Sequence, residues 1–390
     1  MTESRRTGEE RELLRTEAPP SNPDPRHAAG IPPLESRVRY PWFKRRIPEP
    51  VFYVVPALMW LVLSLRHGSL TLPTAANPTM EAGGFFGESK LQGLALFGER
   101  ALRRLAPYVV VEPRAPTGCE QARCSDAMSL LAGAGLDFPV VAKPDVGYQG
   151  WGVRRIDDAA GLLAYLTTCA PDLRLILQRH VGLAGEAGVF YVREPGEPAG
   201  RIASMAFVYA PHVTGDGVRT VEALVKADDV LGKSIAIHAP RNQDRWRLVP
   251  EQGETVALVG PRSARLGAVY RDASASITPA LEAEIDAIAR DIDGLHFGRF
   301  DLKFGSVAGL ERGEDFEILE LNGAGAEMLD IWDGRVGLMA AYRTLWRQYR
   351  KLFAIGAAQR QRGVRPAGLR KVVGMVARQE RMRCRYPVSG

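Results

Sequence analysis

Gly298-Arg299-Phe300-Asp301, followed shortly by Glu317-Ile318-Leu319-Glu320-Leu321-Asn322-Gly323, is the stretch that decides the fold. Residues 300–304 and 316–321 are mainly apolar runs of strand length, a pattern that predicts two adjacent strands of a hairpin. The polar side chains of this stretch lie at the ends of the two runs. They are therefore expected to meet at one end of the hairpin.

Four of these polar residues have side chains suited to phosphate chemistry. In the expected register, Asp301, Glu320 and Asn322 converge on one point, and two carboxylates with an amide oxygen suit Mg²⁺ that arrives with nucleotide phosphates. Arg299 can clamp a phosphoryl or acyl-phosphate oxygen. Two acids and an Asn on a hairpin are more often a solvated face, so this interpretation depends on the segments upstream.

The composition is typical of a soluble globular protein with room for two or three domains. The chain has 390 residues, of which 46% are apolar and 25% are charged, and it contains no repeat array. Its four cysteines form no Cys-x-x-Cys pair, which argues against a disulfide framework and against a zinc site. A reducing cytoplasm is the expected compartment.

The net charge of +6 is unevenly distributed. Residues 335–390 carry 14 Lys and Arg side chains against one acid, Glu380, whereas residues 1–334 carry 37 basic and 44 acidic side chains. The basic balance therefore concerns the partners of the tail and not the ligand of the body.

The N-terminal part contains one long apolar run. Residues 1–36 are rich in charge and Pro, which predicts a disordered arm with no signal peptide. Residues 51–65 are apolar, broken by Pro56 and followed by Arg66, and this run is shorter than the ~20 residues that span a bilayer. Two interpretations remain, a buried segment of an N-terminal domain or a shallow contact with a membrane beside a basic cluster.

Residues 69–134 alternate short apolar runs with helical stretches, which indicates α/β packing. Strands are expected at residues 70–72 and 108–111, and helices at residues 88–104 and 121–133. The glycine-rich segment from Gly83 to Lys90 places a loop at the start of a helix, where backbone N–H groups can hold an anion; a plain tight turn is the alternative.

A second strong signal lies between Phe138 and Val153. A buried strand leads to Lys143, and a loop with Gly147, Gly150 and Gly152 follows at once. Such a loop can close its backbone amides over a phosphate while the lysine neutralises charge. Further on, residues 175–181 are predicted to form a strand that runs into a hinge, Glu186 follows, and residues 189–193 are predicted to form another strand.

These pieces, in this order, resemble the ATP-grasp superfamily. The resemblance covers residues 70–330, and the turn from Gly215 to Thr220 resembles one found in peptide-forming members. Among subgroups, the Arg-x-Asp and Glu-x-Asn motifs are similar to those of D-alanine–D-alanine ligases, while the segment from Gly83 to Lys90 looks more like sugar-transferase-associated ATP-grasp proteins.

The resemblance implies ATP as a cofactor with Mg²⁺, two ions of it or Mn²⁺ in its place. It implies a ligase that joins a small-molecule carboxylate to an amine through an acyl phosphate. The residues it implies are Arg299 and Lys143 for catalysis; Lys143, Gly147, Gly150, Gly152, Gln178, His180, Val181 and Glu186 for ATP; and Asp301, Glu320 and Asn322 for the metal.

The chain departs from the family pattern at several positions. An additional lysine is usual on the helix before the Lys143 strand, and this chain offers Arg123 there, with Lys90 as a substitute from elsewhere. Gln178 and Arg179 stand in the hinge where an acidic residue is common. Asn322 is followed by Gly-Ala-Gly-Ala-Glu instead of the Pro-Gly-Met-Thr-like loop of the D-alanine enzymes, which puts that substrate in doubt.

Two flanking segments have readable roles. Thr278 and Pro279 are expected to open a scaffold helix that Gly294 ends, with a buried stripe of Leu281, Ile285, Ile288 and Ile292. The basic stretch from His238 to Arg271 suits an acidic acceptor or a solvated surface.

From residue 338 onward, an apolar stripe predicts a helix that packs on a core or a partner, or binds an anionic membrane. Residues 359–390 are expected to be loosely ordered.

The predicted fold is therefore α/β of the α+β ATP-grasp kind. Residues 1–36 form an arm, residues 37–135 a small N-terminal α/β domain, residues 136–335 two subdomains that grip ATP, and residues 336–390 a basic helical tail. The alternative to a ligase is a membrane-recruited, non-catalytic nucleotide-binding module at the inner face of the membrane. No specific nucleic-acid partner is expected, because no binding motif is present.

Overall fold

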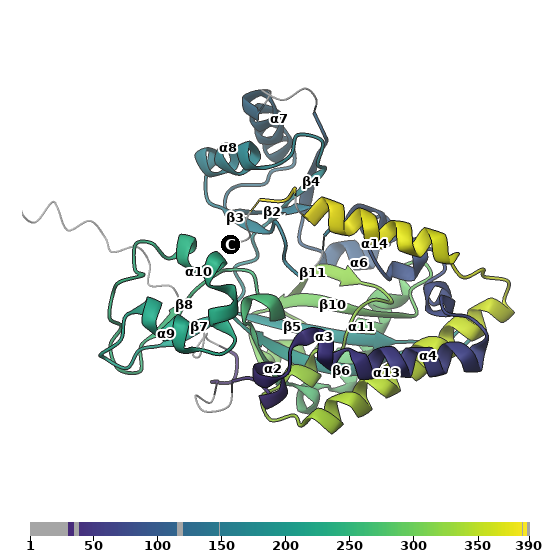
Figure 1. The fold of residues 1–390 in the computed structure, drawn as a ribbon. Helices are drawn as coiled ribbons and strands as arrows, with labels where there is room; N and C mark the ends of the chain where they lie inside the picture. The colour runs from purple at the N-terminus through teal and green to yellow at the C-terminus, as the bar shows by residue number, and fades with distance from the viewer. Residues whose placement is uncertain (1–29, 35–38, 115–119, 148, 384, 388–390) are drawn as a thin grey trace, which may run out of the picture.

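The computed structural model describes residues 30–34, 39–114, 120–147, 149–383 and 385–387. Two antiparallel sheets organise these residues, as the α+β prediction requires (Figure 1). The larger sheet has five strands in the order β11-β10-β5-β6-β9. Their bounds are β5 Gly185–Val192, β6 Arg201–Tyr209, β9 Val269–Asp272, β10 Phe297–Phe304 and β11 Phe316–Asn322.

A smaller, four-stranded sheet has the order β1-β4-β2-β3. The strand expected at residues 108–111 is present as β1, and it pairs with β4 instead of with an N-terminal neighbour. Helices α7 and α8 pack on this sheet around one apolar core, so the predicted domain boundary at residue 135 falls inside a single unit. The bounds are β1 Tyr108–Val111, α7 Glu120–Gly133, β2 Val140–Pro144, β3 Arg154–Ile156, α8 Ala159–Thr168 and β4 Leu175–Arg179.

Alternating side chains of the larger sheet pack against different helices. Val189 and Tyr191 lie in the core shared with α11 (Pro279–Arg290), whereas Phe190 and Val192 pack toward α13 (Leu338–Gln361). This alternation follows from the two-residue period of a strand. Phe300 and Leu302 of β10 point into the α11 core. Arg299 and Asp301, which alternate with them along the strand, therefore face the α13 side of the sheet.

Helix α11 begins as predicted but ends at Arg290, with Asp291 as its C-cap, so that Ile292 and Gly294 lie beyond the helix. The Thr278 hydroxyl accepts a hydrogen bond from the backbone N–H of Leu281 at 3.1 Å, and Pro279 occupies the first turn. The stripe residues Leu281, Ile285, Ile288 and Ile292 are each at most 1% exposed. The helix therefore buries one complete face against the sheet that carries Asp301.

The N-terminal region is helical and differs from the α/β prediction. Residues 70–72 are not a strand, because Leu72–Ala75 form a 3-10 turn whose side chains pack under α13. The single helix expected over residues 88–104 is two short helices. Residues 1–29 of the predicted arm lie outside the described residues, while Ile31 and Leu34 pack against the main core. The bounds are α2 Trp42–Arg46, α3 Glu49–Phe52, α4 Val54–His67, α5 Lys90–Leu94 and α6 Glu99–Arg104.

The remaining elements form a small lobe and the C-terminal helices. The lobe contains β7 (His212–Thr214), β8 (Thr255–Ala257), α9 (Val221–Ala227) and α10 (Ile235–Arg241), and α12 spans Val307–Glu311. Residues 359–390 were expected to be loosely ordered, but α14 (Leu369–Arg383) is a helix that passes near the small sheet (Figure 1). The Tyr386 hydroxyl beyond it donates a hydrogen bond to the carbonyl oxygen of Val146.

The packing of α13 on the N-terminal 3-10 turn leads to a stability prediction. A Cβ atom added to Gly356 would lie 2.6 Å from the carbonyl oxygen of Leu72, whereas one added to the exposed Gly374 of α14 meets nothing within 4 Å. Gly356→Ala should lower the free energy of unfolding by about 1–3 kcal/mol because the backbone cannot yield. Gly374→Ala should leave it unchanged or raise it by up to about 1 kcal/mol through helix propensity. Urea unfolding of both variants measures the difference, and equal stability would contradict the packing described.

Candidate active site

A β-bulge in the hairpin places the predicted polar residues on one face. Leu302 pairs with Ile318, but the next pair is Asp301 with Glu320, so that Leu319 is the extra residue. Before the bulge, Phe316 and Ile318 face the core, and after it Leu321 does so. Bulges re-aim side chains in this way next to functional sites. Here the bulge turns Glu320 and Asn322 toward the cleft.

The four side chains of the hairpin contact one another. Arg299 donates to both carboxylate oxygens of Asp301, through Nε at 2.6 Å and Nη2 at 2.9 Å. The Asn322 amide lies 2.9 Å from an oxygen of Asp301 and 3.2 Å from an oxygen of Glu320. The convergence expected from the sequence is therefore present in the structure.

Lys143 reaches this hairpin from the other sheet. Its ammonium donates to Oε1 of Gln178 at 2.8 Å and to the carbonyl oxygen of Leu319, the bulge residue, at 3.2 Å. Burial lowers the pKa of Lys143 to about 8. Burial alone would raise the pKa of Glu320, but Lys90 and Lys143 together lower it to about 2. Glu320 is accordingly an ionised carboxylate between two lysines.

Lys90, and not Arg123, approaches the site as the second lysine. Its ammonium lies 2.8 Å from Oε2 of Glu320. Arg123 is buried in the small-sheet unit, where its guanidinium donates to the carbonyl oxygen of Leu173. The sequence did not decide between Lys90 and Arg123 as the second basic residue of the site. The distance of each residue from Glu320 depends on contacts between segments that are far apart in the chain.

A cleft of about 1270 Å³ is lined by residues of both sheets. The residues named as catalytic, ATP-binding or metal-binding that line it are Lys143, Gly147, Gly150, Gln178, His180, Val181, Glu186, Arg299, Asp301, Glu320 and Asn322.

 Counted over the whole prediction, eleven of the twelve site residues therefore line the cleft, and Gly152 is the exception.

Gly152 has a structural position behind the glycine loop. Its φ of +71° favours glycine, and an added Cβ would lie 2.7 Å from the ring of Pro144. Its carbonyl oxygen accepts a hydrogen bond from Tyr165 at 2.8 Å. Gly150 shares the same φ but lines the cleft. Only the front of the loop therefore faces the space in which a phosphate could lie.

The predicted hinge divides into a buried and an open part. The side chain of Gln178 is 3% exposed and is held by Lys143 and by the carbonyl oxygen of Ala106, to which it donates at 3.0 Å. Gln178 therefore orients the lysine. Arg179, His180 and Val181 continue along the cleft wall, and burial lowers the pKa of His180 to about 4, so that its ring is neutral.

Glu186 lies on the cleft side of β5 with basic neighbours. It pairs in register with Lys303 and forms an ion pair with Arg262 at 3.3 Å. Burial raises the pKa of Glu186. The sequence named Arg262 only as part of a basic stretch. Of that stretch, Arg241, Arg245 and Arg262 line the cleft, whereas His238 and Asn242 are fully buried.

The segment from Gly83 to Lys90 is not an anion cup in this structure. The backbone N–H of Gly87 donates to Oε1 of Gln379 on α14 at 2.7 Å, and that of Lys90 donates to the carbonyl oxygen of Asp145 at 3.0 Å. The carbonyl oxygens of Gly83 and Gly84 accept hydrogen bonds from the loop that follows Asn322. The segment instead forms a wall of the cleft.

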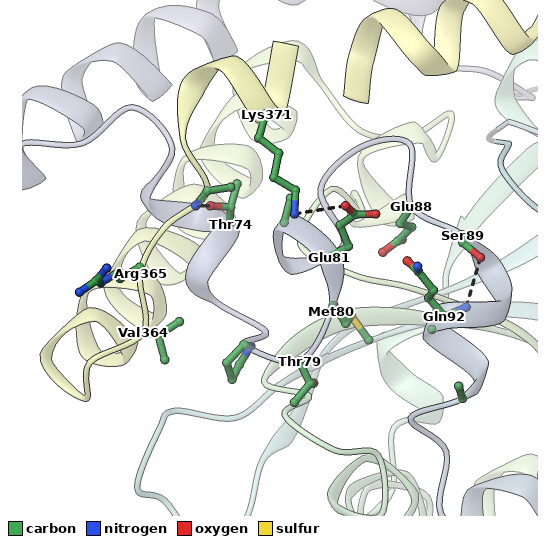
Figure 2. A pocket seen from close by; sticks show the side chains of 15 residues that line it. Thr74, Thr79, Met80, Glu81, Glu88, Ser89, Gln92, Val364, Arg365 and Lys371 are labelled. Atoms are coloured by element: carbon green, nitrogen blue, oxygen red, sulfur yellow. Dashed lines mark hydrogen bonds and ion pairs between the residues drawn. The ribbon is translucent and has the colours of Figure 1, made fainter. Parts of the chain in front are cut away.

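A second cavity of about 640 Å³ lies behind that wall (Figure 2). It is lined by Glu81, Glu88 and Lys371, among others, and Lys371 forms an ion pair with Glu81 at 3.2 Å. None of the predicted site residues lines it. Burial raises the pKa of Glu88, which borders both cavities, to about 7.

Comparisons of the whole chain identify similar solved structures. No protein-family model and no curated protein sequence matches the chain. A bifunctional glutathione synthetase from Pasteurella multocida is 14% identical with a TM-score of 0.36, over 66% of this chain and 36% of that one. The D-alanine–D-alanine ligase from Coxiella burnetii is 11% identical with a TM-score of 0.36, over 73% of this chain and 62% of that one.

A third similar structure, D-cycloserine synthetase DcsG, is 14% identical with a TM-score of 0.35, over 66% of this chain and 69% of that one. These structures are ATP-grasp ligases, the superfamily that the motifs resemble. The chain spans about a third of the length of the glutathione synthetase. At these TM-scores and identities, the likeness carries no activity over to this chain.

The contacts of Gln178 predict a large effect of an isosteric change. Gln178→Leu leaves the buried Lys143 ammonium without its amide acceptor and the carbonyl oxygen of Ala106 without its side-chain donor. The free energy of unfolding should fall by at least about 2 kcal/mol, since each unsatisfied buried group costs about 1–3 kcal/mol. The matched control is Gln361→Leu at the exposed end of α13, which should change it by less than about 0.5 kcal/mol. Similar losses in both variants would contradict the orienting role.

Proposed function

We propose that the chain is an ATP- and Mg²⁺-dependent ligase that joins a carboxylate to an amine through an acyl phosphate. One observation carries the proposal: Lys143 of the small sheet lies 3.2 Å from the bulge carbonyl of a hairpin that presents Asp301, Glu320, Asn322 and Arg299 to the same cleft. A lysine opposite paired carboxylates suits a nucleotide triphosphate that brings its own metal.

The hairpin fits a magnesium ion with few protein ligands. Two carboxylates and one amide stand within hydrogen-bonding distance of one another. The described ranges contain no group of three His, Cys, Asp or Glu side chains that suits a metal, and the hairpin itself offers two carboxylates and an amide. Mg²⁺ usually keeps water and phosphate oxygens among its six ligands, so Asp301, Glu320 and Asn322 suffice to hold it. When bound, Mg²⁺ screens the phosphate charge that repels an incoming carboxylate.

The cleft offers a position for each part of the nucleotide. Lys143 and the loop front at Gly147 and Gly150 would hold the phosphate tail. The strand end from Arg179 to Val181 would lie along the base through its backbone, and Glu186 would accept hydrogen bonds from the ribose. The neutral His180 is compatible with a place beside an uncharged base.

The reaction requires no covalent nucleophile of the protein. A carboxylate oxygen of the substrate would attack the terminal phosphorus, and the bond to the ADP oxygen would break. The amine, once it has lost its ammonium proton, would then attack the carbonyl carbon of the acyl phosphate through its nitrogen. Phosphate would leave with the electrons of the C–O bond, and the nitrogen would release a further proton to solvent. Arg299 would stabilise the oxyanion. Asp301 fixes its guanidinium in place, and the described contacts engage three of its five N–H donors, which leaves two for the oxyanion.

The metal assignment is tested by removing each carboxylate. Asp301→Ala and Glu320→Ala should each lower ATP turnover at least 100-fold with a native unfolding transition, because the Mg²⁺–ATP complex loses a ligand. The matched control is Glu314→Ala, an exposed acid just before β11 that pairs with Arg312. Turnover is measured as phosphate release in a screen of amino acids, hydroxy acids and sugar acids with amines, with mass spectrometry of any adduct. Unaltered turnover in either site variant sinks the assignment.

A specific observation also supports contact with an anionic membrane at the cytoplasmic face. Residues Glu49–His67 are long and apolar enough to cross a bilayer by length and composition, and only 22% of that segment is buried. The outward side chains of α4 include Leu58, which is 56% exposed, and Leu65, which is 74% exposed. Arg45 and Arg46 precede the segment and Arg66 closes it, which suits a helix that lies in an anionic interface.

The membrane contact has its own test. Leu58→Glu should reduce co-sedimentation with phosphatidylserine-containing vesicles at least five-fold, because a charge enters the apolar face. Leu248→Glu is the matched control, since Leu248 is 60% exposed and lies far along the chain from α4. If Leu58→Glu sediments like the wild type, the contact does not exist. Phosphate release by the same variant separates a recruited enzyme from a non-catalytic module, which would bind vesicles and release none.

Deletion of the basic tail, residues 335–390, is not a suitable test of the membrane contact. Leu345 and Phe353 of α13 are fully buried, and α13 packs on both α4 and the 3-10 turn at Leu72–Ala75. Removing residues 335–390 would therefore expose core surface. The predicted core role of the stripe on α13 is confirmed by this packing.

A further inference from the structure

The cleft continues past Arg299 into a compartment with aromatic walls. Its rings come from segments far apart in the sequence, and all of them line the cleft. The rings of Trp60 and Phe85 lie 5.1 Å apart, and those of Trp60 and Tyr349 lie 5.3 Å apart. We call Tyr53, Trp60, Phe85, Trp332 and Tyr349 the aromatic compartment.

One carboxylate stands inside the aromatic compartment. Oε1 of Glu327 accepts a hydrogen bond from the Tyr53 hydroxyl at 3.0 Å, and Oε2 accepts one from the Trp332 indole N–H at 2.9 Å. Both donors are neutral. In the described part of the chain, no Lys, Arg or His forms an ion pair with Glu327 within 4.0 Å, in contrast to Glu320, which pairs with Lys90. The two hydrogen bonds fix the carboxylate in place without a direct ion pair among the described side chains.

The surroundings of Glu327 favour a cation. Burial raises the pKa of Glu327, although its two hydrogen bonds and the charge of Arg299 act in the opposite direction. Glu49 lines the same end of the cleft. Aromatic faces attract cations, and an ammonium beside a desolvated carboxylate gains both interactions. Lys90 and Lys143 instead lie against the hairpin, at Glu320 and at the carbonyl oxygen of Leu319, and make that part of the cleft cationic.

The aromatic compartment adjoins the catalytic hairpin through one residue. Arg299 donates from Nη1 to the backbone carbonyl oxygen of Glu327 at 2.9 Å, while its other donors hold Asp301. A group held by Glu327 is therefore next to the side chain that would stabilise an acyl phosphate.

We propose that the aromatic compartment binds the amine substrate as an ammonium paired with Glu327, and that this substrate is a primary amine with a planar apolar group. The inference rests on the proposed ligase function, which assigns the cationic end of the cleft to ATP. The carboxylate selects the charge, and the rings of Trp60, Tyr349 and Phe85 select the apolar group.

The test is an equilibrium titration of the full chain without nucleotide, followed by ligand-observed NMR. The probe is phenethylamine, and the comparators are 2-phenylethanol, which lacks the charge, and propylamine, which lacks the ring. Phenethylamine should bind at least ten-fold more tightly than either. Equal affinity for 2-phenylethanol would overturn the role of the carboxylate, and equal affinity for propylamine would overturn the role of the rings.

Variants locate the binding. Glu327→Gln should weaken phenethylamine at least ten-fold and leave affinity for an ATP analogue within two-fold. The matched control is Glu380→Gln, which removes a charge that lines the same cleft but is paired with Arg383 at 3.1 Å. Tyr349→Leu, which keeps Glu327 and its two donors, should also weaken phenethylamine and keeps the test valid if Glu327→Gln does not fold.

The outcomes separate this inference from the ligase proposal. Because the titration contains no ATP, loss of turnover in Asp301→Ala has no bearing on it. Unchanged phenethylamine affinity in Glu327→Gln overturns the amine site and leaves the ligase proposal standing. Normal amine binding beside a wild-type chain that releases no phosphate with any substrate overturns the ligase and not the compartment.

Discussion

The contact between Lys143 and the bulge carbonyl of Leu319 is the constraint on which the site depends. A buried ammonium is costly unless acceptors surround it. The small sheet supplies the side chain of Gln178 as one acceptor, and the large sheet supplies another, the carbonyl oxygen of Leu319 at the bulge. The two sheets are thus joined at the place where one of them presents its carboxylates.

Much of this arrangement follows from local patterns in the sequence. The capping Thr278 and the stripe of α11 act within one helix, and the Lys143 strand is a continuous apolar run, so both were predictable. The bulge also has a sequence signal. Ile318 and Leu319 are consecutive apolar residues, after which Glu320 and Leu321 resume the alternation with the opposite phase, and an extra residue in the strand is what such a change of phase requires.

Other features depend on contacts that a linear pattern does not encode. Leu72 is apolar in any interpretation, and only its packing under α13 makes it a 3-10 turn and not a strand. Gly152 looks like its neighbours in the loop, yet the ring of Pro144 places it behind them. Glu327 follows a run of small residues without any motif, and its donors come from Tyr53 and Trp332, one of them 274 positions away. Sequence reasoning therefore located the phosphate end of the cleft and missed the aromatic end.

The hydrogen bond from Gly87 to Gln379 has a kinetic consequence. It joins positions 292 residues apart, and contacts of high sequence separation form slowly. The docking of α14 against the segment from Gly83 to Lys90 is therefore expected to be a late step in folding. Just before that step, the hairpin and Lys143 would already be in place. The cleft would still be open to solvent on the side that α14 lines.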